Sequence, residues 1–134
     1  MDSGLAKAVR AAAAYDLVTC LPMAVPGLAW HYLSFLAWAG GAVGLHGAPL
    51  GAVSPTGMML VNFLGASMTV WAALRLVRPE RVYAVADCAN RVFFLLAMAY
   101  AFAAGVPGIL WVVAAAELGL LALQAWAFRP NQNL

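Results

Sequence analysis

The sequence predicts an all-α protein, a polytopic integral membrane four-helix bundle that forms a single transmembrane domain over residues 1–134. Three observations predict this class. Hydrophobic residues make up 66% of the 134-residue chain and charged residues only 9%, against about 50% and about 25% in a soluble domain. Four apolar stretches are long enough to cross a membrane. Polar residues recur inside these stretches at helical spacing. A soluble globular domain, a disordered chain and a nucleic-acid-binding protein are therefore excluded.

Proline, glycine and basic residues divide the chain into four predicted spans, at about residues 5–28, 57–77, 80–104 and 108–128. Pro55 precedes the second span, and Arg78-Pro79 follows it. Val106-Pro107-Gly108 has the composition of a tight turn, so the last two spans form an antiparallel hairpin. Arg129-Pro130 ends the fourth span.

The basic residues predict the orientation of the spans. They occur at the N-terminus, around the second connection and at the C-terminus, whereas the first and third connections contain none: Lys7, Arg10, Arg75, Arg78, Arg81, Arg129. Since cytoplasmic loops are enriched in Lys and Arg, both termini are expected in the cytoplasm.

Residues 27–45 allow two interpretations. A fifth span there would move Arg75, Arg78 and Arg81 to the outside, against the distribution of positive charge. We therefore expect a kinked first helix followed by an external segment that lies on the membrane, with aromatic interfacial anchors at Trp30, Tyr32 and Trp38. Gly40-Gly41 and the stretch from Gly44 to Gly47 would end this segment in a loop.

Several polar residues lie inside the predicted spans: Asp16, Asn62, Asp87, Asn90, Arg91, Glu117, Gln124. A charged side chain at the centre of a membrane helix costs about 2.5–3.5 kcal/mol, so we expect these residues to face the interior of the bundle. On the second span, small and polar residues share one predicted helix face, which allows close helix packing: Asn62, Gly65, Ala66, Thr69, Ala73.

Depth in the membrane predicts specific partners. Arg91 and Glu117 each lie about eleven residues from the cytoplasmic end of their spans, roughly 16 Å at 1.5 Å per residue. Antiparallel neighbours would bring them to the same level, so we predict that they pair. Asp87, four residues before Arg91, can share the same guanidinium, and Asp16 is expected near the level of Asp87.

Three deep carboxylates then face one deep guanidinium, because Arg75 is expected nearer the interface. We expect at least one carboxyl to be protonated near neutral pH, with Asp16 as the first candidate since it lacks an evident partner. Asp16 and Glu117 are the predicted catalytic acids. The predicted ligand-binding residues are Asn62, Asp87, Asn90 and Arg91. The alternative is that these buried groups only fix helix register.

Part of the chain resembles the DoxX-like families of small four-helix bacterial membrane proteins. The resembling segments are Asn62-Phe63-Leu64-Gly65 at the start of a helix, Arg91 in the next helix, and Ala116-Glu117-Leu118-Gly119-Leu120-Leu121 in the last. They lie between Asn62 and Phe128, about half of the chain. The resemblance implies a helical bundle with a buried Arg/Glu pair in a bacterial inner membrane, and it implies no reaction.

Three functions are compatible with these patterns. The favoured hypothesis is a site for a lipophilic ligand (an isoprenoid, a sterol-like lipid or a quinone), with acid–base catalysis as an extension. Its predicted apolar lining is Phe63, Phe93, Phe94, Met98, Tyr100. The alternatives are an accessory subunit of a larger membrane complex and a homo-oligomeric proton-coupled transporter. The sequence contains no cofactor motif and no metal-ligand spacing.

Overall fold

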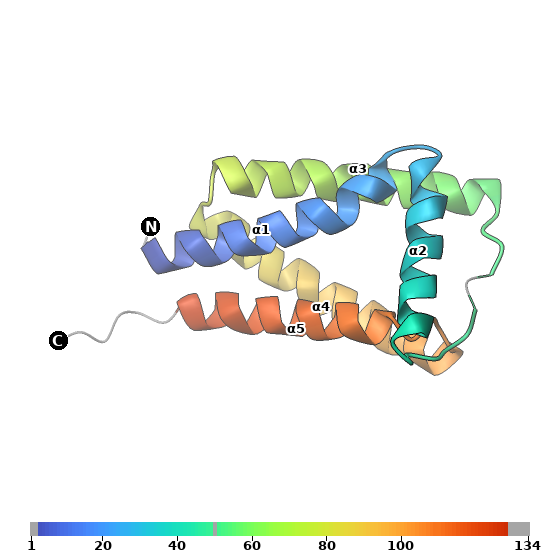
Figure 1. Ribbon diagram of the computed structural model, residues 1–134. Coiled ribbons are helices and arrows are strands. Elements are labelled where there is room, and N and C mark those ends of the chain that lie inside the picture. Colours follow the sequence, from blue (N-terminus) through green and yellow to red (C-terminus); the bar gives the residue numbers. More distant parts are fainter. Residues whose placement is uncertain (1–2, 50, 129–134) are drawn as a thin grey trace.

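The computed structural model describes residues 3–49 and 51–128, and this part of the chain is helical without strands. Its helices are α1 (Ser3–Ala24), α2 (Leu28–Ala42), α3 (Pro55–Val77), α4 (Arg81–Ala104) and α5 (Leu110–Ala127). Figure 1 shows α1, α3, α4 and α5 running along a common direction, with α2 lying across one end of this bundle. The start of α1 and the end of α5 lie together at the opposite end.

The first helix is shorter than predicted. It ends at Ala24 instead of near Leu28, and α2 follows at an angle of 120°. Pro26 has no N–H to continue the helical hydrogen bonds, and Gly27 adopts a positive φ of 84°, which glycine tolerates without a Cβ clash. These two residues end α1 and turn the chain into α2.

The predicted external segment is α2 together with the loop that follows it. The sequence predicted that Gly40 and Gly41 end the helical part of this segment, but α2 continues to Ala42. Gly40 is buried, and a Cβ there would lie 2.9 Å from the Cβ of Ile109. The glycine therefore lets the end of α2 pack against the start of α5.

The second span has a well-defined start. Ser54 lies at the N-cap of α3, and its hydroxyl accepts a hydrogen bond from the Gly57 N–H at 3.0 Å. Pro55 follows at the first helical position, where its fixed φ and missing N–H suit a helix start. The structure thus extends the predicted span by two residues toward its N-terminus.

Close packing of α1 on α3 depends on a glycine. Gly65 is buried, and a Cβ there would lie 2.5 Å from the backbone nitrogen of Ala24. The predicted small-residue face is only partly correct, because Ala66 and Ala73 are exposed, whereas Ala72 is fully buried. The face of α3 that packs in the bundle thus includes Gly65 and Ala72.

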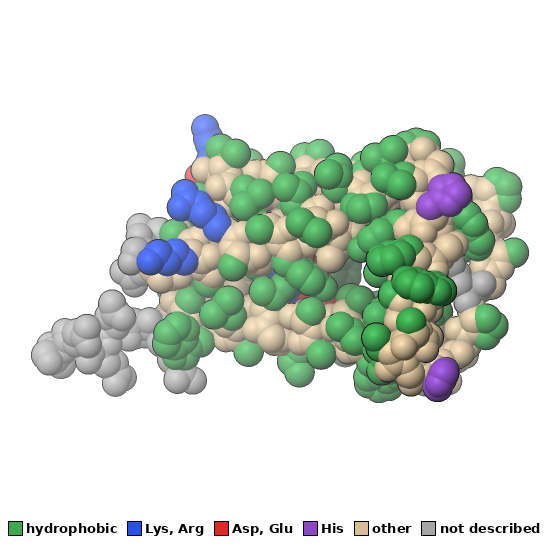
Figure 2. Space-filling view, viewed as in Figure 1, with side chains coloured by type: hydrophobic (Ala, Val, Ile, Leu, Met, Phe, Trp, Pro, Cys, Tyr) green, Lys and Arg blue, Asp and Glu red, His purple; other side chains and the backbone are tan. Residues whose placement is uncertain are grey.

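Burial is inverted relative to a soluble protein. The largest fully buried side chains include Arg75, Arg91 and Asp87, while large apolar side chains such as Phe93 (70% exposed) and Tyr100 (81%) face outward. Figure 2 shows hydrophobic side chains spread along the visible face of the bundle. Three helices, α3, α4 and α5, are long and apolar enough to cross a membrane, and α1 with α2 form a fourth, broken candidate.

Exposed charges gather at one end. Among the described residues they are Lys7, Arg10, Arg78, Glu80 and Arg81, and Figure 2 shows blue side chains at the end where α1 begins. Arg10 on α1 donates to the Leu76 carbonyl near the end of α3, which ties these two termini together. Arg129, which also entered the prediction of orientation, lies outside the described residues.

Candidate functional site

Four helices contribute to one buried cluster of ionic and polar side chains, which we call the ionic cluster: Asp16, Arg75, Asp87, Arg91, Glu117, Gln124. Helical spacing places each member on an inward face. On α1, the buried stripe formed by Leu5, Val9 and Ala12 reaches Asp16 one turn later. On α1, the charged residue of the cluster thus follows apolar residues on the same inward-facing side of the helix.

Arg91 joins three carboxylates. Its Nη1 donates to Glu117 Oε2, its Nη2 donates to Asp16 Oδ2 at 2.7 Å, and its Nε donates to Asp87 Oδ2 at 3.2 Å. The predicted Arg91–Glu117 pair and the predicted sharing of Arg91 with Asp87 are confirmed. One guanidinium thereby links α1, α4 and α5.

Asp87 accepts more contacts than the other carboxylates. Arg75 Nη1 lies 2.6 Å from Asp87 Oδ1, and Gln124 Nε2 donates to Asp87 Oδ2 at 2.7 Å. The indole N–H of Trp71 also donates to Oδ1, at 3.4 Å. Arg91, Gln124 and Trp71 donate to the two oxygens of Asp87, and the ion pair with Arg75 adds a second positive charge beside it.

The sequence-based prediction placed Arg75 near the interface, and this was wrong. Arg75 is 0% exposed, and its Nη2 donates to Asp16 Oδ2 at 2.5 Å. Helical side chains tilt toward the N-terminus of their helix, which for α3 means toward the middle of the bundle. The excess of deep carboxylates over one guanidinium was the signal that could have identified this second cation.

The predicted role of Asp16 changes as a consequence. Asp16 was the first candidate for a neutral carboxyl because it lacked an evident partner. In the structure its Oδ2 accepts from both Arg75 and Arg91. Asp16 therefore has two cationic partners, and the reason for naming it as the first candidate no longer holds.

Two predicted ligand-binding residues lie outside the ionic cluster. Asn62 Nδ2 donates to the Met23 carbonyl at 2.7 Å, near the point where α1 ends. Asn90 Nδ2 makes only a weak contact of 3.9 Å with Met68 Sδ. Asn62 therefore stabilises the bend between α1 and α2, and neither amide contacts the charged side chains.

The predicted aromatic lining is also largely wrong. Phe63 and Phe93 are 62% and 70% exposed, and Tyr100 faces outward as well, while Phe94 and Met98 are half-buried. Apolar residues that face lipid and residues that face an internal cavity have the same composition, so composition could not separate them. The outward aromatic side chains form part of the apolar exterior.

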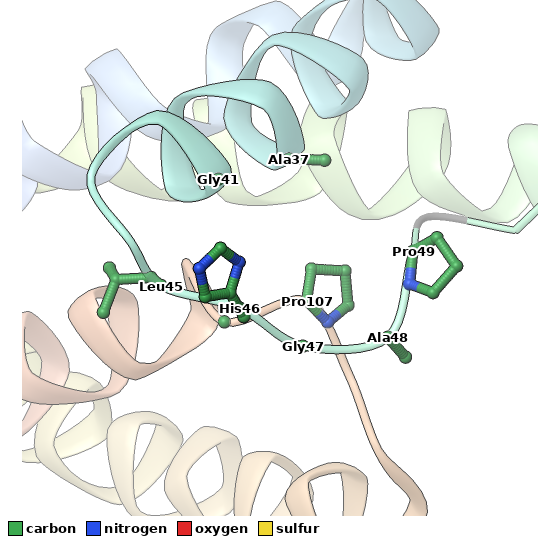
Figure 3. A pocket seen from close by; sticks show the side chains of 9 residues that line it. Ala37, Gly41, Leu45, His46, Gly47, Ala48, Pro49 and Pro107 are labelled. Atoms are coloured by element: carbon green, nitrogen blue, oxygen red, sulfur yellow. The ribbon is translucent and has the colours of Figure 1, made fainter.

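A pocket lies at the other end of the bundle from the exposed charges. It is formed by the end of α2, the loop after it and the turn between α4 and α5, with His46 and Pro107 among its lining residues. Figure 3 shows His46 beside Pro107. Gly47 and Gly108 let these two backbone segments approach closely, so that this pocket borders a tight loop contact far from the ionic cluster.

Two acidic side chains are the most exposed members of the ionic cluster. The side chains of Glu117 and Asp16 keep 7% and 5% of their surface exposed, whereas that of Arg75 keeps 0%. Glu117 Oε1 and Asp16 Oδ1 have no hydrogen-bond partner among the described residues. The cluster can therefore offer two carboxyl oxygens as hydrogen-bonding groups, while Arg75 Nε and Nη1 are buried without a hydrogen-bond partner in the described part of the chain.

Comparison with protein-family models, with curated proteins and with solved structures finds no match to this chain. The resemblance to the DoxX-like families stays a prediction. Within residues 3–49 and 51–128, no three His, Cys, Asp or Glu side chains are grouped to hold a metal ion.

Proposed function

We propose that this chain is a multi-pass protein of a bacterial inner membrane, with the end of the bundle near Ser3 and Ala127 in the cytoplasm. The apolar exterior and buried charges support a lipid environment, since water would solvate charges better on the outside. The exposed Lys7, Arg10, Arg78 and Arg81 lie near the start of α1, the end of α3 and the start of α4, which Figure 1 shows at this one end, and cytoplasmic segments are enriched in such residues.

Within that membrane, the ionic cluster is proposed to bind the polar head of a lipophilic small molecule, such as an isoprenoid, a sterol-like lipid or a quinone. The observation that supports this most is Glu117, whose Oε1 lacks a partner although the side chain is only 7% exposed. An accessible carboxylate oxygen without a partner accepts a hydrogen bond from a ligand hydroxyl, and the protonated acid donates one to a ligand carbonyl.

The proposed roles follow from the contacts. Glu117 contacts the ligand head, because it combines an unpaired oxygen with residual access. Arg91 positions Glu117 through the contact with Oε2, and Asp16 and Asp87 fix Arg91 in place. Any acid–base step on the ligand would use Glu117 as the group that exchanges the proton.

Native mass spectrometry of the protein released from detergent micelles tests this proposal. The wild type is compared with Glu117→Gln and with Glu80→Gln, a matched control in which the same chemical change is made at an exposed glutamate. Wild type and Glu80→Gln are expected to retain a lipophilic small molecule, and Glu117→Gln is expected to lose it. Equal retention by all three proteins, or a bare wild-type chain, would contradict ligand binding at Glu117.

A second candidate is an accessory subunit of a larger membrane complex. One observation favours it: both arginines and Asp87 already have partners within the chain, so the cluster can fix helix register without a ligand. The same mass spectra separate the two functions, because an accessory subunit would be released with partner chains and without a small molecule that depends on Glu117.

A further inference from the structure

The charges of the ionic cluster do not balance. Asp16, Asp87 and Glu117 supply three carboxylates, and Arg75 and Arg91 supply two guanidiniums. Arginine stays protonated in proteins, so a fully ionised cluster would have one negative charge in excess. An uncompensated charge is strongly disfavoured in the interior of a membrane bundle, and uptake of one proton removes it.

The contacts indicate which carboxyl receives this proton. Asp87 is contacted by Arg75, Arg91, Gln124 and Trp71. Asp16 accepts from both guanidiniums, but within residues 3–49 and 51–128 Glu117 has an ion pair with Arg91 and with no other cation. Protonation of a carboxylate loses the least electrostatic stabilisation where the carboxylate has the fewest cationic partners.

The groups that face Glu117 from neighbouring helices add to this preference. On α1, Tyr15, Asp16 and Cys20 lie within electrostatic range of Glu117. On α4, Asp87 and Arg91 do so, and Cys88 lies beside Asp87. On α3, Arg75 is engaged with Asp16 and Asp87. Glu117 thus has one guanidinium as its direct partner and two carboxylates close by.

We propose that Glu117 is a proton-binding site, and that the folded protein retains one exchangeable proton there through the free Oε1. The carboxylate takes the proton from a hydronium ion, which leaves a carboxylic acid and a water molecule. The charge of the cluster then changes from one negative excess to zero. The residual exposure of Glu117 gives water a route to this oxygen. This inference does not depend on a ligand.

Infrared spectroscopy of the protein in phosphatidylcholine vesicles tests the assignment, after bound small molecules have been removed by detergent exchange. At neutral pH the wild type is expected to show a carboxylic-acid C=O stretching band that shifts in D₂O. Glu117→Gln is expected to lose this band, whereas the matched control Glu80→Gln keeps it. Glu117→Asp is expected to keep a band at a displaced frequency, which provides a second test should Glu117→Gln fail to fold.

Three results would overturn the proposal: no such band in the wild type, a band that persists in Glu117→Gln, or a band of Glu117→Asp identical to that of the wild type. Loss of the band in Asp16→Asn with persistence in Glu117→Gln would place the proton on Asp16 instead. Because the sample contains no bound small molecule, failure here is distinguishable from failure of ligand binding.

A second readout is the dependence of stability on pH. A native state that binds one more proton than the unfolded state loses stability as pH rises. The unfolding midpoint of the wild type is therefore expected to fall as pH rises from the acidic range, where a glutamate of the unfolded chain already ionises, through neutral pH. Glu117→Gln removes the group and is expected to flatten this dependence, while Glu80→Gln is expected to leave it unchanged. A slope shared by all three proteins would contradict the proposal.

Discussion

The two halves of the bundle are held together by different means. The half nearer the start of α1 contains the ionic cluster, in which Arg75 and Arg91 connect carboxylates from α1, α4 and α5. The half beneath α2 contains no charged residue, since residues 17–74 and 92–116 lack Asp, Glu, Lys and Arg. There, helices approach through glycine, as at Gly65, and through the Asn62 amide on the Met23 carbonyl.

Because of this difference, the two halves are expected to respond differently to amino-acid substitution. Apolar surface gives little drive for helix association in lipid, so packing and hydrogen bonds must supply it. In the ionic half, each charged side chain contacts oppositely charged partners, and removing one breaks these direct ion pairs. In the uncharged half, contacts depend on the absence of a side chain. We therefore expect the largest effects of substitution in the ionic cluster and smaller effects beneath α2.

The largest effect is expected for Asp87→Asn. The neutral amide removes the anionic partner that Arg75 Nη1 and Arg91 Nε contact directly, and breaking a buried ion pair by removing one partner costs about 3–5 kcal/mol. The free energy of unfolding in mixed micelles, followed by tryptophan fluorescence, measures this loss. Glu80→Gln, the same type of change at an exposed site, should alter stability little. Similar behaviour of the two variants would mean that the cluster is not a connected ionic network.

An intermediate effect is expected for Gly65→Ala. The new methyl group would meet the backbone of Met23 and Ala24, with 2.5 Å to the Ala24 nitrogen, and overpacking of this kind costs about 1–3 kcal/mol. Gly119→Ala is the matched control, because nothing lies within 4 Å of a Cβ at Gly119. The control should gain roughly 0.5–1 kcal/mol from better helix propensity. Equal shifts in the two unfolding curves would rule out a close α1–α3 contact at Gly65.

The smallest effect is expected for Asn62→Leu. This substitution removes one interhelical hydrogen bond, to the Met23 carbonyl, and such bonds are worth about 0.6 kcal/mol on average in a membrane protein. Asn90→Leu serves as the control, since Asn90 makes only a long contact with Met68. Unfolding in mixed micelles is again the measurement. A larger loss for Asn90→Leu than for Asn62→Leu would show that the bend after α1 does not depend on Asn62.

The two halves also differ in how much the sequence could predict. The Arg91–Glu117 pair followed from equal depth on antiparallel helices, which depends only on the rise per residue. Arg75 was missed because depth was counted along the backbone, whereas its long side chain reaches about one helical turn further into the bundle. Asp16 accepts from Arg75 as well as from Arg91, so the reason for naming Asp16 as the neutral acid depended on where these two side chains lie.

Beneath α2, sequence patterns predicted a kink and an external segment but placed the end of α1 too late. Pro26 and Gly27 determine the break, yet Pro22 lies inside α1, so that proline alone did not identify the position. The outward orientation of Phe93 and Tyr100 also required coordinates, because both a lipid-facing surface and a ligand cavity are apolar. Long-range placement of side chains, rather than helix formation, limited the prediction.

The most direct test of a lipid-embedded bundle with inward charges is spin-label accessibility in vesicles. Single cysteines would replace Leu96, which is 62% exposed on the apolar exterior, and Lys7, which is exposed at the charged end, in a background with Cys20 and Cys88 replaced by alanine. The label at position 96 is expected to collide with molecular oxygen and not with a water-soluble nickel chelate, and the label at position 7 to show the reverse. Free collision of the nickel chelate with the label at position 96 would contradict a membrane-spanning bundle.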